Sequence, residues 1–133
     1  MIYALDSDII SYMLKGDRDV QSNFNDLIDN NNFYSIPPLV YYEIKRGLTT
    51  KKAYRKLQDF SDLYSDSIKG EMTLEVWQKA VEIYCRLKSQ GRIIGDGDIF
   101  IAAFCLINDY VLVTNNIKHF GNIEELKITT LVD

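Results

Sequence analysis

The sequence predicts an α/β fold in which a mainly parallel central sheet lies between two helical layers, a three-layer α/β/α sandwich. Short apolar segments of strand length, at residues 2–6, 33–36, 110–114 and 127–132, alternate with helical patterns. This alternation favours a parallel sheet that helices cover on both faces. The chain has 133 residues and neither an internal repeat nor a low-complexity linker. We therefore expect residues 1–133 to form one domain with a single core.

The first elements follow from apolar runs and capping residues. Residues 2–6 have the apolar character of a buried strand, and Ser7 or Asp8 can cap the helix that follows. Residues 20–28 predict a second short helix. A polar turn of asparagines then leads to the short strand at residues 33–36.

Two more helices are expected in the middle of the chain. Proline is tolerated in the first turn of a helix, so Pro37-Pro38 is a suitable start. This helix is expected to run to Arg46 and to stop at Gly47. Residues 52–63 carry apolar residues at a helical period, and residues 67–69 have the pattern of a short strand.

The second half begins with an amphipathic helix that Thr73 caps and Gly91 ends. Residues 99–108 are apolar on nearly all sides, which predicts a buried helix, and strands are expected at 110–114 and 127–132. The amphipathic helix is expected to place these residues on one side: Leu74, Trp77, Val81, Tyr84 and Leu87.

Composition limits the class of protein. Apolar residues make up 47% and charged residues 26% of the chain, which is ordinary for a globular protein. The first residues lack the pattern of a secretory signal, and the longest apolar run, 99–107, is too short to cross a membrane. We therefore expect a cytoplasmic protein, with Cys85 and Cys105 as reduced, buried thiols.

Four acidic residues stand where a strand should end, where a helix should begin or within an apolar helical stripe: Asp6, Glu43, Asp96 and Asp98. Acidic groups at the edges of buried elements are costly unless a positive partner holds them. In parallel sheets the ligand crevice lies beyond the carboxyl ends of the strands, where Asp6 and residues 114–116 are expected. These positions predict a site that binds a cation.

Each of these acids also has a purely structural interpretation. Glu43 can be an edge residue whose carboxylate reaches water. Asp98 in the first turn of a helix is favoured by the helix dipole, and Asp96 is a natural helix cap. Asp6, at the inner end of a buried strand, is the hardest to explain by packing alone.

Hard cations such as Mg²⁺ or Mn²⁺ prefer oxygen ligands and would relieve the repulsion among these carboxylates. Water on such an ion has a lowered pKa and can attack a phosphodiester. No cluster of cysteine and histidine predicts zinc. The single histidine, His119, is expected to be structural or exposed rather than catalytic.

Four motifs in chain order resemble those of PIN-domain ribonucleases and span nearly the whole chain. Singly each is weak, but together they are fairly specific. They are Leu5-Asp6-Ser7-Asp8-Ile9; Tyr42-Glu43-Ile44 with Gly47-Leu48; Ile94-Gly95-Asp96-Gly97-Asp98 followed by Ile101-Ala102-Ala103; and Val111-Leu112-Val113-Thr114-Asn115-Asn116 with His119-Phe120. The length and layout are similar to those of VapC-type toxins of toxin–antitoxin pairs.

The resemblance implies a Mg²⁺-dependent endoribonuclease that acts on structured RNA such as tRNA. It also implies a homodimer and a small antitoxin that occludes the site. By position, Asp6, Glu43 and Asp98 would be the core metal ligands, with Asp96 as an accessory acid. The hydroxyls of Ser7 and Thr114 would orient ligands or the attacking water.

Two residues depart from the family pattern. Asp8 stands where asparagine is usual and adds a negative charge. Asn116 stands where many relatives have a fourth aspartate, so it would be an accessory residue, and a second metal would bind weakly or only with substrate.

The net charge of −4 argues mildly against a protein that grips nucleic acid by charge alone. Basic residues nevertheless cluster within twelve positions, either as a solvated helix face or as a phosphate-contacting patch. They are Lys45, Arg46, Lys51, Lys52, Arg55 and Lys56.

Two other functions remain open. Asp6-Ser7-Asp8-Ile9 is also similar to the nucleophile motif of haloacid-dehalogenase-type phosphatases, with Asp6 as nucleophile and Asp8 as acid–base. Only Ile93-Ile94 precede Gly95, however, which is too short for the strand that this motif needs. The second alternative is a catalytically silent binding module on a PIN-like fold.

Overall fold

The computed structural model describes residues 1–132. Its centre is a four-stranded sheet in the order β2-β1-β3-β4, in which every neighbouring pair is parallel. The strands are β1 (Ile2–Leu5), β2 (Phe33–Ser35), β3 (Val111–Val113) and β4 (Ile128–Thr129). In the register of β1 and β3, Leu5 lies opposite Val113, so the carboxyl ends of the two central strands meet.

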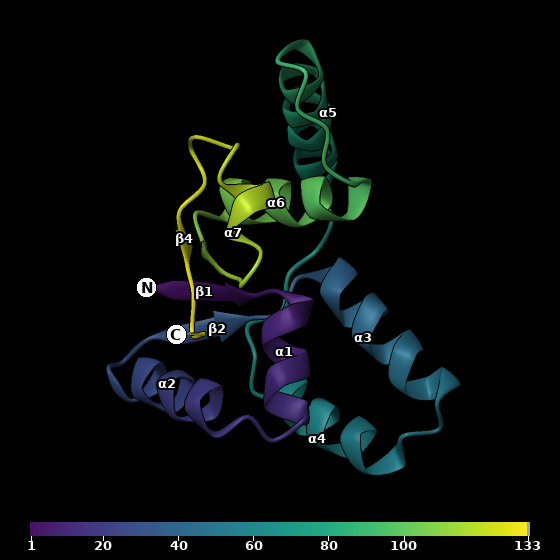
Figure 1. The fold of residues 1–133 in the computed structure, drawn as a ribbon, viewed down its shortest axis with the longest axis vertical. Coiled ribbons are helices and arrows are strands. Elements are labelled where there is room, and N and C mark those ends of the chain that lie inside the picture. The colour runs from purple at the N-terminus through teal and green to yellow at the C-terminus, as the bar shows by residue number, and fades with distance from the viewer. Residues whose placement is uncertain (133) are drawn as a thin grey trace.

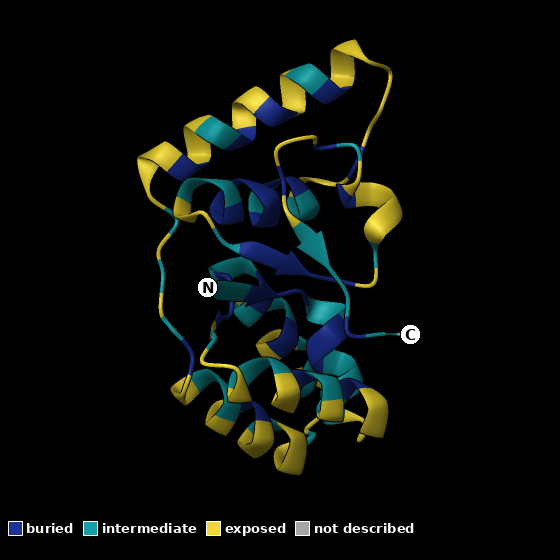
Figure 2. Ribbon diagram, turned by 90° about the vertical axis from the view of Figure 1, so that its left-hand side faces the viewer, coloured by how far each residue is buried: buried dark blue, intermediate teal, exposed yellow. Residues whose placement is uncertain are grey.

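Helices cover both faces of the sheet, as predicted (Figure 1). One layer contains α1 (Ser7–Leu14), α2 (Arg18–Asp29), α3 (Pro38–Thr50) and α4 (Tyr54–Ser65). The other contains α5 (Leu74–Ser89), α6 (Asp96–Asn108) and α7 (Ile117–Phe120). Figure 2 shows the buried strands between these layers and α5 as the outermost helix of its side.

The first helix begins directly at the end of β1. Asp6, rather than Ser7 or Asp8, is the N-cap, and its side chain accepts a hydrogen bond from the backbone N–H of Ser7. Ile9 and Ile10 are buried on the inner face of α1. The chain therefore leaves the buried strand and enters a helix at the carboxylate that the sequence singles out.

Helix α3 is longer than predicted, because it passes through Gly47 and ends at Thr50. A glycine inside a helix costs only about 1 kcal/mol relative to alanine. Buried Ile44 and partly buried Leu48 anchor the helix to the core on either side of that glycine. The helix ends where Lys52 adopts a left-handed backbone conformation, with φ of 53°.

Residues 67–69 do not form the predicted strand. Within the described residues they contribute a single parallel bridge, between Ser35 and Ile68. The hydroxyl of Ser35 donates to the carbonyl oxygen of Ile68 across 2.8 Å, and this bond holds the segment at the sheet edge beside β2.

The apolar side of α5 that the sequence singles out is mostly not the side that meets the core. Thr73 caps the helix as expected, but the buried residues are Val76, Ala80, Ile83 and Leu87. Four residues of the predicted stripe are exposed instead: Leu74, Trp77, Val81 and Tyr84. The helix carries two adjacent apolar stripes at helical spacing, and periodicity alone does not tell which of them meets the core.

The two cysteines differ in setting. Cys105 is buried, as predicted, and burial raises the pKa of its thiol. Cys85 is exposed, contrary to expectation, because it lies on the outer side of α5. In the described part of the chain no helix is both long enough and apolar enough to span a membrane.

Candidate metal centre

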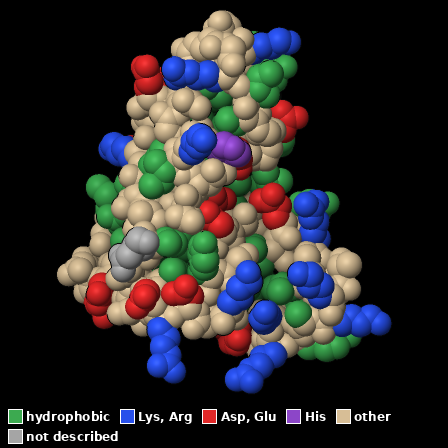
Figure 3. All heavy atoms as spheres, viewed as in Figure 1, with side chains coloured by type: hydrophobic (Ala, Val, Ile, Leu, Met, Phe, Trp, Pro, Cys, Tyr) green, Lys and Arg blue, Asp and Glu red, His purple; other side chains and the backbone are tan. Residues whose placement is uncertain are grey.

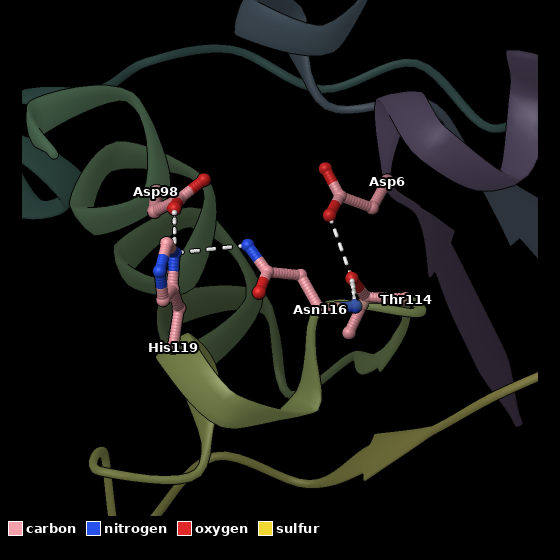
Figure 4. Close-up of polar contacts among 5 residues, drawn as sticks. All are labelled: Asp6, Asp98, Thr114, Asn116 and His119. Atoms are coloured by element: carbon pink, nitrogen blue, oxygen red, sulfur yellow. Dashed lines mark hydrogen bonds and ion pairs between the residues drawn. The ribbon is translucent and has the colours of Figure 1, made fainter. Parts of the chain in front are cut away.

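The centre of the site is the Asp6 carboxylate, which follows β1 and is only 5% exposed. The backbone N–H of Asp6 donates to the carbonyl oxygen of Val113 at 2.9 Å, which extends the pairing of β1 with β3. The hydroxyl of Thr114, at the end of β3, donates to Asp6 Oδ2 across 2.7 Å (Figure 4). The Ser7 N–H donates to Oδ1 across 2.8 Å. Two adjacent strand ends thus fix one carboxylate.

The environment of Asp6 disfavours its negative charge. Burial is the main cause of a pKa raised to about 6. The hydrogen bonds from Thr114 and Ser7 lower this pKa, while the charges of Asp8 and Asp98 raise it. Donors hold the carboxylate in place, but no positive charge compensates it. A cation at this position would supply that compensation.

Glu43 approaches the same region from α3. A side chain at Gly97, near the start of α6, would come within 3.9 Å of Glu43 Oε2 and within 3.4 Å of Leu39. These distances are ordinary van der Waals contacts, and they show that α3 and α6 lie side by side at Glu43. Burial raises the pKa of Glu43, the charge of Arg46 lowers it, and the charge of Asp98 raises it.

Glu43 Oε1 is the one buried side-chain oxygen or nitrogen in residues 1–132 that has no hydrogen-bond partner. Such an atom costs about 1–3 kcal/mol unless something satisfies it. A metal ion can bind such an oxygen, because hard cations prefer carboxylate ligands. This atom fits the cation site that the sequence predicts.

Asp98 lies in the first turn of α6, and its carboxylate and that of Asp6 flank the same space (Figure 4). Its side chain is 27% exposed. Its charge contributes to the raised pKa values of Asp6, Asp8 and Glu43, so these four acids are electrostatically close. Asp98 thus lies near both Asp6 and Glu43, and the role of these three acids as metal ligands stays a prediction.

Asp8 has a structural task. Its Oδ1 accepts from the Ile9 N–H at 2.7 Å, and its Oδ2 accepts from the Asn115 N–H at 3.0 Å. The carboxylate thereby ties α1 to the loop after β3. Burial raises its pKa, partly offset by these bonds. These two bonds use one lone pair of each oxygen and account for Asp8 as a structural link.

The remaining predicted residues lie further out. Asp96 is the exposed first residue of α6. The N-cap position, which the sequence predicted for Asp96, is occupied by Gly95. Ser7 meets Asp6 through its backbone N–H. The backbone N–H of Asn116 donates to the Thr114 hydroxyl oxygen at 2.9 Å, so Asn116 borders the site.

Sequence reasoning missed the position of His119. Its Nδ1 lies 3.2 Å from Asp98 Oδ2 and 2.9 Å from Asn116 Nδ2, and its side chain is 52% exposed. His119 is exposed, as expected, but it belongs to the group of site residues (Figure 4). The available signal was its place in a short helix a few residues after the polar end of β3.

The acids border a common space without forming a closed cage. Within residues 1–132, no three histidine, cysteine, aspartate or glutamate side chains are already close enough to enclose an ion. Mg²⁺ ordinarily keeps several waters and takes one or two carboxylates, so an open arrangement of this kind suits it.

Comparison with known proteins identifies the family. The PIN domain matches residues 3–126. The chain belongs to the PIN-domain family. Ribonuclease VapC2 of Rickettsia felis is 30% identical over 127 residues, which is 95% of each chain. Ribonuclease VapC1 of Haemophilus influenzae is 28% identical over 132 residues, 96% of each chain. The chain is thus a PIN-domain protein of the VapC type.

Solved structures agree with the fold. The crystal structure of VapBC2 from Rickettsia felis, bound to a DNA fragment from its promoter, matches with a TM-score of 0.89 and 28% identity, over 98% of each chain. FitAcB from Neisseria gonorrhoeae matches with a TM-score of 0.78 and 20% identity over 98% of each chain, which shows the fold alone. The three-layer architecture is therefore that of the PIN domain.

Proposed function

We propose that this PIN-domain protein is an endoribonuclease toxin that depends on Mg²⁺ or Mn²⁺ and cleaves structured RNA such as tRNA in the cytoplasm. The observation that carries the proposal is the unsatisfied, buried oxygen of Glu43, whose carboxylate lies near Asp98, which in turn lies near Asp6. Similarity to proteins named ribonucleases supports the same reaction. Residues 1–133 act as one nuclease domain.

Asp6, Glu43 and Asp98 would hold the ion, with Asp96 as an accessory acid at the rim. The ion supplies a bound water of lowered pKa and positive charge near the phosphodiester. Thr114 orients Asp6 through its hydroxyl, and Ser7 does so through its backbone N–H. Because these donors leave Asp6 without a neutralising charge, its carboxylate keeps its affinity for a cation.

We propose that the basic patch, Lys45, Arg46, Lys51, Lys52, Arg55 and Lys56, contacts RNA phosphates. All six side chains are exposed, on the last turns of α3, in the connection that follows it and at the start of α4. Figure 3 shows basic side chains gathered over these helices, beside the acidic side chains near the histidine. Arg46 stacks over the Tyr42 ring at 5.0 Å, which holds its guanidinium near Glu43.

The antitoxin would bind a groove of about 920 Å³ between α1, α2 and α4. Its floor is apolar, with Phe24, Leu63 and exposed Phe33, and its rim carries Asp59, Asp62 and Asp66. An amphipathic segment with basic residues fits this surface. Solved relatives of this fold are toxin–antitoxin complexes.

The groove lies at the far end of α1 from Asp6. An eight-residue helix is about 12 Å long, so an inhibitor seated there needs roughly four extended residues more to reach the carboxylates. Phe33→Ser should weaken antitoxin binding in a co-purification assay and leave RNA cleavage by the free toxin unchanged. Undiminished binding would place the antitoxin elsewhere.

A homodimer is the second assembly that we propose, formed through the exposed stripe of α5, Leu74, Trp77, Val81 and Tyr84. Trp77 packs edge-on against Phe100 of α6 at 4.9 Å between ring centroids, so its ring is held in place rather than free. A rigid aromatic residue within an exposed apolar stripe is a feature of protein interfaces.

Cleavage of tRNA with and without Mg²⁺ tests the activity. Asp6→Asn, Glu43→Gln and Asp98→Asn should each abolish cleavage and leave the circular dichroism spectrum unchanged. Asp109→Asn is the matched control, because Asp109 is an exposed acid with a left-handed backbone that asparagine tolerates. No magnesium-dependent cleavage by the wild-type protein would favour the silent binding module.

A further inference from the structure

His119 brings a ring nitrogen to a site whose other candidate metal ligands are carboxylate oxygens. Its Nδ1 faces Asp98 Oδ2 at 3.2 Å, and the amide nitrogen of Asn116 lies 2.9 Å from the same Nδ1. The ring belongs to α7, which follows β3, whereas Asp98 lies in the first turn of α6. Two separate elements therefore bring an imidazole nitrogen to a carboxylate that also influences Asp6 and Glu43.

The hydrogen bonding around this nitrogen depends on the tautomer: a protonated Nδ1 donates to Asp98, whereas the other tautomer leaves that contact without a donor. When the Asn116 amide donates to Nδ1, that nitrogen is an acceptor and carries no proton. Asp98 Oδ2 is also an acceptor, so the 3.2 Å contact then joins two lone-pair atoms. Something positive between them would convert a repulsive contact into a favourable one.

A metal ion fits this spacing. Two ligands about 2.1 Å from one ion and at right angles around it lie about 3.0 Å apart. The observed 3.2 Å between Nδ1 and Oδ2 is close to that separation. Carboxylate and water suit Mg²⁺, whereas an imidazole nitrogen favours transition metals.

We propose that His119 Nδ1 is a nitrogen ligand of the metal, next to Asp98, and that it makes the centre prefer Mn²⁺ over Mg²⁺. This inference rests on the proposed metal-dependent function, which requires only the carboxylates. When the ion binds, it replaces the Asn116 amide as the partner of Nδ1. The centre then has mixed nitrogen and oxygen ligands.

Electron spin-echo spectroscopy of Mn²⁺ bound to tag-free protein, without RNA, tests the assignment. The chain contains a single histidine, so an imidazole ¹⁴N coupling to bound Mn²⁺ identifies His119. We expect this coupling in the wild-type protein and its loss in His119→Gln. In that variant the affinity for Mn²⁺ should fall on the order of tenfold, which is typical when a group that supports a metal site is removed. The affinity for Mg²⁺ should fall by much less.

Two further variants sharpen the result. His119→Glu replaces nitrogen by oxygen, so it should keep an ion without ¹⁴N coupling and reduce the preference for Mn²⁺ over Mg²⁺. Lys118→Gln is the matched control, an exposed neighbour in the same helix, and should leave coupling and affinity unchanged.

The outcomes separate the two proposals. One possible result is Mn²⁺ binding to the wild-type protein, its loss in Asp98→Asn and no ¹⁴N coupling. It overturns the role of His119 but leaves the carboxylate centre standing. Coupling that persists in both Asp98→Asn and Asp6→Asn would show that His119 binds an ion elsewhere, which also overturns it. No binding of Mn²⁺ or Mg²⁺ to the wild-type protein overturns both proposals.

Discussion

Thr114 and Asp6 lie at the ends of adjacent parallel strands, and the Thr114 hydroxyl donates to Asp6 Oδ2 across 2.7 Å. This bond and the Ser7 N–H fix the orientation of the carboxylate but do not neutralise it. Asp6 is buried near other acids, and its pKa is raised to about 6. The metal-free protein therefore sacrifices stability at the position where the proposed function needs negative charge.

The first prediction concerns that instability. A carboxyl with a pKa of about 6 in the folded protein and an ordinary value of 3.8 keeps its proton more tightly when folded. Stability should therefore fall as pH rises from about 4 to about 6, by about 3 kcal/mol in total. Asp6→Asn removes this penalty but keeps only one acceptor oxygen for the Ser7 N–H and the Thr114 hydroxyl, so one of these hydrogen bonds is lost, worth about 1 kcal/mol.

Asp6→Asn should thus be more stable than the wild-type protein by about 2 kcal/mol at about pH 8, in urea unfolding with a chelator present. Its stability should also depend less on pH between about 4 and 6. Asp109→Asn should show the wild-type pH dependence, because the Asp109 side chain is 88% exposed. An Asp6→Asn protein less stable than wild type at high pH would contradict the raised pKa.

The second prediction concerns Thr114. Thr114→Val keeps the shape of the buried side chain but removes the donor to Asp6 and the acceptor of the Asn116 N–H. The unfolding free energy should fall by about 1–3 kcal/mol. Since the lost hydrogen bond lowers the pKa of Asp6, that pKa should rise further. The acidic limb of the pH profile of cleavage should then move to higher pH.

Thr114→Ser is the control for this change, because it keeps the hydroxyl and removes only a methyl group. Its pH profile should match that of the wild-type protein. If Thr114→Val cleaved RNA with an unshifted profile, the hydroxyl would have no part in tuning Asp6.

The fold and the core of the site were predictable for a simple reason. Buried parallel strands read as short apolar runs, and their carboxyl ends meet at one edge of the sheet. Asp6 and Thr114 could therefore be assigned to the same place before any coordinates. Glu43 could be assigned to an inward position because its neighbours one turn away are apolar.

Other features depend on tertiary placement that periodicity does not encode. The start of α6 and the short α7 meet only in the folded chain, so periodicity does not predict the contact of His119 with Asp98. The same holds for α5, where Val76 and Val81 lie on adjacent apolar stripes but only Val76 is buried. The end of α3 was misplaced because packing of Leu48 outweighs the weak propensity of Gly47.

The third prediction concerns the basic patch. Replacement of Lys51, Lys52 and Arg55 by glutamine should weaken RNA binding uniformly across sequences. It should also reduce the slope of log affinity against log salt by about 0.7 for each phosphate contact that is lost. A triple substitution of Lys15, Arg18 and Lys127, which are exposed on other elements, is the control of equal charge. Equal effects in the two triples would mean that only the net charge matters.

The last prediction concerns the exposed stripe of α5. Val81 is 64% exposed, so Val81→Asp removes no core contact and should leave the unfolding free energy of the monomer nearly unchanged. In the proposed homodimer, however, it places a charge in an apolar interface and loses about 1.5–3 kcal/mol of burial per subunit. Sedimentation analysis should show a dimer for the wild-type protein and a monomer for Val81→Asp. Lys79→Gln makes the same change in net charge on the opposite, charged side of the same helix and should remain dimeric. A wild-type protein that stays monomeric at every concentration would mean that this apolar stripe serves another partner.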